Sequence, residues 1–138
     1  MKQLAVFLEN TEGRLEEALT LLERKNINII SLSLADTTDY GMLRLIVSDP
    51  ETGKEALKEE GFSAHLAEVV GIKLPHTVGS LNSALHTVSG AGINIEYMYA
   101  LCTKTDEAAI VIKPNDIAKA VEVLTDAGFA LFTDGDLF

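Results

Sequence analysis

Residues 6–29 read VFLENTEGRLEEALTLLERKNINI, and residues 72–95 read IKLPHTVGSLNSALHTVSGAGINI. A displacement of 66 positions aligns the two stretches without a gap. Each copy has an apolar run, a polar turn ending in glycine, a segment with apolar residues three and four apart, and an asparagine between two isoleucines. Between residues 4 and 35, nine residues are identical to their counterparts: Leu8/Leu74, Thr11/Thr77, Gly13/Gly79, Leu15/Leu81, Ala18/Ala84, Leu19/Leu85, Ile27/Ile93, Asn28/Asn94 and Ile29/Ile95. The repeat predicts two copies of one structural unit.

The composition is that of a folded globular protein. Hydrophobic residues make up 47% of the 138 positions and charged residues 23%, which excludes a disordered chain. Each half is small for independent stability, so we expect the units to pack on each other or on a second chain. One cysteine cannot form an internal disulfide, and the apolar run at the start is too short for a signal peptide or a membrane span. We therefore expect a cytoplasmic protein.

The charge argues against two classes of partner. Eleven basic residues stand against 21 acidic ones, giving a net charge of -10 and a sequence pI near 4.6. Nucleic acid and anionic membrane surfaces both need a basic footprint on the protein. We expect neither nucleic acid nor a membrane as partner.

Hydrophobic periodicity gives the same order of elements in both copies. The first predicted helix carries Leu15, Ala18, Leu19 and Leu22 on one face, with Thr11 as its expected N-cap. The expected elements of the first copy are strand 3–9, helix 13–25, strands 27–36 and 42–48, a helix from Asp49-Pro50 to Gly61, and strand 62–70. Those of the second are strand 70–75, helix 79–91, strands 93–103 and 107–113, helix 116–127 and strand 129–134. This order predicts an α+β fold of two ferredoxin-like βαββαβ units with antiparallel sheets, at 1–68 and 69–138.

The first strand of each copy is apolar on both faces. In the first copy, Ala5 and Phe7 alternate with Leu4, Val6 and Leu8. A ferredoxin-like sheet covers one face with helices, so a second apolar face calls for a further layer, within the chain or across a homodimer. The alternative is that these are ordinary scattered exposed apolar residues. We expect covering, and a homodimer.

Residues typical of catalysis are few. His65 and His86 are expected at the surface or in satisfied contacts, and Cys102 is expected to be a buried structural thiol. No Ser/His/Asp grouping, HExxH sequence, P-loop or nucleophile elbow is present. The sequence indicates no catalytic site, no metal site and no cofactor.

The repeated turn is the best candidate site. A helix that starts directly after a buried strand offers backbone N–H groups and a positive dipole end, which suit a carboxylate. Gly13 and Gly79 allow close approach of the backbone, and Asn28 and Asn94 bring amides that need partners. The alternative is purely structural: the glycines permit helix–sheet packing, and the asparagines cap the turn before the next strand.

The pattern of strand, polar residue, x-x-Gly-x-Leu, amphipathic helix and Ile-Asn-Ile, within a βαββαβ unit, resembles the ACT domain. The resemblance covers nearly the whole chain, twice. It implies a regulatory module that binds a small ligand, usually an amino acid, at the turn and at the asparagine. In the family a proline often precedes the glycine, whereas this chain has Glu12 and Val78. The residues that match the family's site are Asn10, Thr11, Glu12, Gly13, Arg14, Leu15, Asn28 and Ile29 in the first copy, and His76, Thr77, Val78, Gly79, Ser80, Leu81, Asn94 and Ile95 in the second.

The resemblance implies a non-catalytic regulatory protein that binds a free amino acid. An enzyme of amino-acid biosynthesis is a candidate for the regulated partner. We favour a site that includes the second turn, because His76, Tyr97 and Tyr99 can give its pocket selectivity, although Asn10 is closer to the family's pattern. A structural or assembly module and a small ferredoxin-like enzyme are the alternatives.

Overall fold

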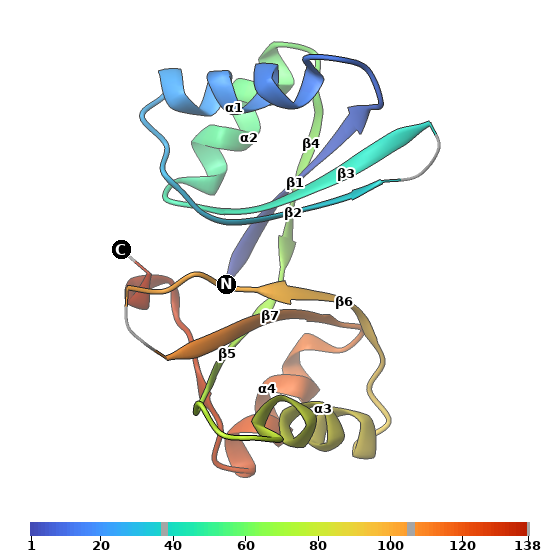
Figure 1. Cartoon of the computed structure of the whole chain (residues 1–138), viewed down its shortest axis with the longest axis vertical. Helices are drawn as coiled ribbons and strands as arrows, with labels where there is room; N and C mark the ends of the chain where they lie inside the picture. Colours follow the sequence, from blue (N-terminus) through green and yellow to red (C-terminus); the bar gives the residue numbers. More distant parts are fainter. Residues whose placement is uncertain (37–38, 105–106, 138) are drawn as a thin grey trace. The chain divides into compact units, whose positions relative to one another are not determined.

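The computed structural model describes residues 1–36, 39–104 and 107–137. The chain divides into two compact units, one formed by Lys2–Ala67 and the other by Met1 with Glu68–Phe138. Each unit has its own sheet and its own hydrophobic core (Figure 1).

The first unit has the predicted βαββαβ order. Its sheet has the strand order β2-β3-β1-β4, with β1 antiparallel to β3 and β3 antiparallel to β2. Helices α1 and α2 lie on one face of this sheet (Figure 1). The elements are β1 (Lys2–Glu9), α1 (Arg14–Arg24), β2 (Ile29–Asp36), β3 (Tyr40–Val47), α2 (Pro50–Glu59) and β4 (Ser63–Glu68).

The core of the first unit lies between its helices and its sheet. Leu4, Val6 and Leu8 of β1 alternate inward and are fully or nearly fully buried, together with Leu22 of α1 and Leu57 of α2. This pattern follows from the period of two in a strand and of 3.6 in a helix. The predicted apolar stripe of the first helix is therefore confirmed as its core-facing side.

The other face of β1 is less uniform than the sequence predicts. Gln3 and Ala5 are buried there, whereas Phe7 is 40% exposed and stacks on Tyr40 with ring centroids 4.2 Å apart. In β2, Leu32 and Leu34 lie opposite Leu45 and Leu43 on the helix-covered face, yet both are about half exposed. Because β2 is an edge strand, its side chains lie at the margin of the core.

The second unit repeats the arrangement. Its strand order is β6-β7-β5-β8, and α3 and α4 lie on one face of the sheet (Figure 1). The elements are β5 (Val70–Leu74), α3 (Ser80–Gly90), β6 (Ile95–Ala100), β7 (Ala108–Pro114), α4 (Ile117–Asp126), β8 (Ala130–Leu131) and the 3-10 turn η1 (Asp134–Asp136). The prediction of two ferredoxin-like units with antiparallel sheets is thus confirmed.

Three local predictions are wrong. The strand expected at 129–134 is only Ala130–Leu131, because Thr133 donates from its backbone N–H to the Asp136 carboxylate at 2.8 Å and starts a 3-10 turn. The strand expected at 93–103 ends at Ala100, which leaves Cys102 outside it and exposed, not buried. The first helix is capped not by Thr11 but by Gly13, without a side-chain hydrogen bond.

Candidate ligand groove at the start of helix α3

The backbone of the second turn is fixed by hydrogen bonds within the turn. The Pro75 carbonyl accepts from the Thr77 N–H and from the Ser80 hydroxyl, each at 2.8 Å. Gly79 then takes a left-handed conformation with φ of 85° at the N-cap of α3. No side chain caps this start of α3, in which all residues are described. The helix thus begins with N–H groups and the positive end of its dipole at the surface.

A groove of about 570 Å³ adjoins this turn. Its volume lies within the range typical of small-molecule sites. Met98 and Ala100 of β6 lie opposite Ile112 and Ile110 of β7, on the helix-covered face of the sheet. The groove therefore runs between the start of α3 and the edge strand β6. It is lined by Leu74, Pro75, His76, Thr77, Val78, Ser80, Leu81, Met98, Tyr99, Ala100, Ala108, Ala109 and Ile110.

The groove is apolar and carries no carboxylate, lysine or guanidinium among its lining residues. Its polar side chains are the imidazole of His76 and the hydroxyls of Thr77 and Ser80. Tyr99 alternates with Met98 and Ala100 along β6, so its side chain lies on the other face of the sheet. The first turn of α3 likewise has no acidic residue. Such a site can bind a molecule that combines a carboxylate with an apolar body.

The first turn has the same backbone but different chemistry. Gly13 has φ of 83°, and the Glu17 N–H donates to its carbonyl as the Ser83 N–H does to that of Gly79. The start of α1 is acidic, with Glu16 and Glu17 in its first turn. The Arg14 Nη1 lies 3.0 Å from the Glu17 carboxylate and the guanidinium 3.9 Å from the centre of the Phe62 ring, whereas the buried Arg14 Nε has no hydrogen-bond partner among the described residues.

A polar cavity of about 350 Å³ lies beside α1 instead. Its lining consists of charged and polar side chains with one leucine: Gly13, Glu16, Glu17, Thr20, Leu21, Arg24 and Glu60. Of the predicted site residues in the first copy it contains only Gly13. Three carboxylates around it make it unsuitable for an anion.

The predicted asparagines lie away from the turns. The Asn94 N–H donates to the Asn115 side chain at 3.1 Å, and the Asn94 carbonyl accepts from the Asn115 N–H at 2.9 Å. Asn28 forms the corresponding pair with Ser48. Each asparagine follows the far end of an 11-residue helix, which spans about 16 Å. Within one unit, therefore, the structure does not bring the asparagine to the turn.

Asn10, Thr11 and Glu12 are exposed in the first turn and line neither the groove nor the cavity beside α1. Other predicted residues lie in the groove or in the cores. His76, Thr77, Val78, Ser80 and Leu81 all line the groove. Ile29 and Ile95 begin edge strands and pack against the cores of their units, as does Leu15. Tyr99 contributes to the groove lining, whereas Tyr97, opposite Lys113, does not.

Sequence reasoning missed the wall of the groove. Met98, Ala100, Ala108 and Ile110 belong to β6 and β7, far from the turn in sequence. The available signal was the small size of Ala100 and Ala108, which leaves room beside the turn. Among residues 1–36, 39–104 and 107–137, no cluster of three or more His, Cys, Asp or Glu side chains is arranged to hold a metal ion.

The family follows from comparison with known proteins. The family model described as the ACT domain pair matches residues 1–138. This chain belongs to the ACT domain pair family. The resemblance found in the repeated turn and the Ile-Asn-Ile segment is thereby confirmed over the whole chain.

Two solved structures have a similar fold. Protein BT0572 from Bacteroides thetaiotaomicron is 41% identical, with a TM-score of 0.91 over 98% of this chain and 93% of that one. The regulatory subunit of aspartate kinase from Thermus thermophilus, in a ligand-free form, is 16% identical, with a TM-score of 0.64 over 92% of each chain. The latter likeness shows the fold alone. No curated protein matches the chain.

The helices of this ACT pair are short. In the part of the chain that the structure describes, none is long and apolar enough to cross a membrane.

Proposed function

We propose that this ACT pair is a regulatory protein that binds a free amino acid reversibly and does not transform it. The observation that carries the proposal is the uncharged groove of about 570 Å³ beside the uncapped start of α3. ACT domains are regulatory modules, and the family match covers both halves of the chain. We place the two ACT domains at 1–68 and 69–138.

The groove offers complementary groups for a zwitterion. The Ser80 and Ser83 N–H groups donate to the Thr77 and Gly79 carbonyls, so the N–H groups of Leu81 and Asn82 are the ones that can donate to the ligand carboxylate. The helix dipole favours negative charge there. The ammonium can donate to the hydroxyl oxygen of Thr77 at the rim. These contacts hold and orient the ligand without any proton transfer.

Binding without turnover is favoured by the composition of the groove. General acid–base catalysis needs a group positioned on the reacting bond, and hydrolysis of an acyl phosphate needs a cationic site for the phosphate. The lining residues include neither a lysine nor an arginine for a phosphate, and their one imidazole, His76, has no carboxylate among them to orient it. Ligand occupancy itself is then the signal.

The regulatory signal requires a partner. We propose that the protein acts in the cytoplasm, as a homodimer, on a separate enzyme of amino-acid biosynthesis. The half-exposed leucines Leu32 and Leu34 on the edge strand of the first unit support a second chain, because contiguous exposed apolar side chains mark interaction surfaces.

A thermal-shift screen of the proteinogenic amino acids at millimolar concentration tests the proposal. A bound ligand stabilises the fold by an amount that grows with its concentration, about 2.7 kcal/mol at a hundredfold excess over the dissociation constant. Calorimetry on the hits gives stoichiometry, and acyl phosphates serve as a turnover control. Absence of heat and of any shift with all amino acids would leave a packing-only module, and turnover of an acyl phosphate would contradict the non-catalytic role.

A further inference from the structure

We infer that the groove beside α3 selects an amino acid with an uncharged, apolar side chain, and that the matching position of the first unit binds none. The inference rests on the function proposed above and adds the ligand class and the number of sites. It is carried by the side chains of the groove and by those that replace them in the first unit.

The interior of the groove is built from aliphatic side chains. Leu74 and Ile110 are nearly fully buried in the core of the second unit and form its base, with Leu81 packed against the same core. Met98 stands at the side and is 41% exposed, so a ligand that covers it removes apolar surface from water. A flexible thioether side chain adapts to ligands of different shape.

A charged ligand side chain has no counterpart in this groove. The lining residues have no carboxylate for a lysine or arginine ligand and no lysine or arginine for an aspartate or glutamate ligand. A charge that loses water without gaining a partner opposes binding. The absence of charge therefore acts as a filter for the side chain, while the start of α3 faces the carboxylate that all amino acids share.

The first unit differs at the positions that leave the groove open. Leu34 occupies the place of Ala100, 66 positions earlier, and lies opposite Leu43 as Ala100 lies opposite Ile110. A methyl terminus of Leu34 lies 3.1 Å from the point where a Cβ on Gly41 would stand. The longer side chain thus lies over Gly41 of β3, in the space that Ala100 and Ala108 leave open in the second unit.

The first turn also repels a carboxylate. Glu12 stands where the second turn has Val78, and Glu16 and Glu17 lie in the first turn of α1. Val78 is fully exposed at the rim of the groove. Arg14, the nearby cation, is held by Glu17 and by the Phe62 ring. Size and charge both assign binding to the second unit.

Isothermal titration of the full chain with a homologous series tests the ligand class. We expect one ligand per chain and an affinity that rises about fourfold with each added methylene from alanine through 2-aminobutyrate and norvaline to norleucine. Aspartate, glutamate, lysine and arginine should bind at least about tenfold more weakly than norleucine, since their charges are desolvated without a partner. Tighter binding of a charged amino acid, or two equal sites per chain, would overturn the inference and leave the proposed function intact. Failure of every amino acid to bind would instead remove the proposed function.

Variants that exchange residues between the two units test the location. Ala100→Leu should weaken norleucine binding at least about tenfold by filling the groove. Leu34→Ala, the reverse exchange, should leave the affinity unchanged. Val78→Glu should weaken binding in a salt-dependent way, whereas Val78→Gln, which has the same size without charge, should not. Because Val78 is fully exposed, this pair remains informative even if Ala100→Leu does not fold. Full binding by both Ala100→Leu and Val78→Glu, with normal circular dichroism, would exclude the groove as the site.

Discussion

Gly13 and Gly79 hold the same backbone conformation, with φ angles of 83° and 85°, at the start of α1 and α3. This left-handed conformation costs free energy for a residue with a Cβ, whereas it does not for glycine. A Cβ built at either position would meet nothing within 4 Å. The glycines are therefore needed for the direction in which the chain enters the helix, and not for space against a neighbouring strand.

Substitution of Gly79 should show this distinction. Gly79→Ala should lower the free energy of unfolding by about 1 kcal/mol because alanine is strained at positive φ, and Gly79→Asn should lower it less. Gly90→Ala is the matched control: it lies at the end of α3 with open space around it and should stabilise by roughly 0.5–1 kcal/mol. Urea unfolding measures all three. An equal effect of alanine at 79 and 90 would contradict the backbone explanation.

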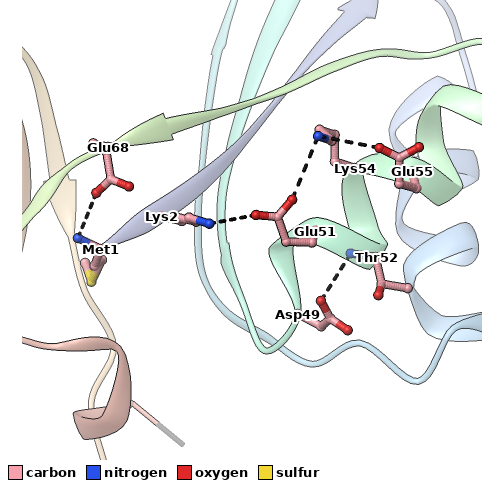
Figure 2. Close-up of polar contacts among 8 residues, drawn as sticks. All are labelled: Met1, Lys2, Asp49, Glu51, Thr52, Lys54, Glu55 and Glu68. Atoms are coloured by element: carbon pink, nitrogen blue, oxygen red, sulfur yellow. Dashed lines mark hydrogen bonds and ion pairs between the residues drawn. The ribbon is translucent and has the colours of Figure 1, made fainter.

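Two carboxylates at the start of α2 should make the free energy of unfolding depend on pH. Figure 2 shows the Asp49 carboxylate accepting from the Thr52 N–H, at 3.1 Å, and Lys2 bonded to Glu51 at 2.7 Å. Hydrogen bonds from the Thr52 side chain and backbone lower the pKa of Asp49 below 3.8, and Lys2 lowers the pKa of Glu51 below 4.5. Both carboxylates thus bind protons less readily in the folded than in the unfolded state.

Stability should consequently fall as the pH drops through these values. A lowered pKa in the folded state contributes stability that is present above the unfolded pKa and lost as the carboxylate is protonated. Between about pH 5 and pH 3, Asp49→Asn should flatten part of the decline, because asparagine keeps the cap but does not titrate. Glu59→Gln, which makes the same change of charge at the end of α2, is the control. Identical pH profiles for wild type and Asp49→Asn would rule out this contribution.

At the scale of elements, α1 and α2 meet closely. A Cβ on Gly53 of α2 would lie 3.2 Å from a methyl of Leu22 and 3.2 Å from a methyl of Leu4. In the second unit the equivalent position is Ala120, which is fully buried. The two units thus reach the same packing of helix on helix and sheet with different small residues.

Enlarging this contact should be costly. Gly53→Val should destabilise the first unit by about 1–3 kcal/mol, because added methyl groups force displacement of Leu22 and Leu4. Glu55→Val places the same side chain at an exposed site of the same helix and controls for helix propensity. Chemical denaturation followed by circular dichroism distinguishes the two variants. Equal stabilities would mean that the helices adjust without cost.

The sequence predicts the elements of the fold and one side of the candidate site. Periods of two and 3.6 and the 66-residue repeat predict each α-helix of the described residues and the order of the elements along the chain, because those patterns record which side of each element is buried. These patterns do not predict where β8 ends, because its end is set by a local capping contact between Thr133 and Asp136. The repeat also predicts the turn at Gly79. It cannot predict that Met98 and Ala100 face that turn, because this depends on strand register and on the sizes of side chains across the sheet.

For the whole molecule, the net charge opposes association with other chains, whereas the exposed apolar surface favours it. A net charge of -10 opposes unspecific association, since like-charged chains repel one another. Yet Leu32 and Leu34, 48% and 46% exposed, lie on an edge strand of the first unit. An apolar edge strand is normally covered or protected by charged residues. An edge strand with exposed leucines in an acidic protein therefore favours specific binding of a second chain.

The homodimer prediction can be tested by sedimentation at micromolar concentration. We expect a species of about twice 14.9 kDa for the wild type. The double variant Leu32→Glu/Leu34→Glu should sediment as a folded monomer, because carboxylates brought together across an interface repel and are poorly solvated there. Its thermal unfolding, extrapolated to low concentration, should stay close to that of the wild type, since both side chains are already half exposed. Val121→Glu, at a similarly exposed apolar site on α4, is the control and should remain dimeric. A wild type that sediments only near 14.9 kDa would refute the dimer, and a dimeric double variant would place the contact elsewhere on the chain.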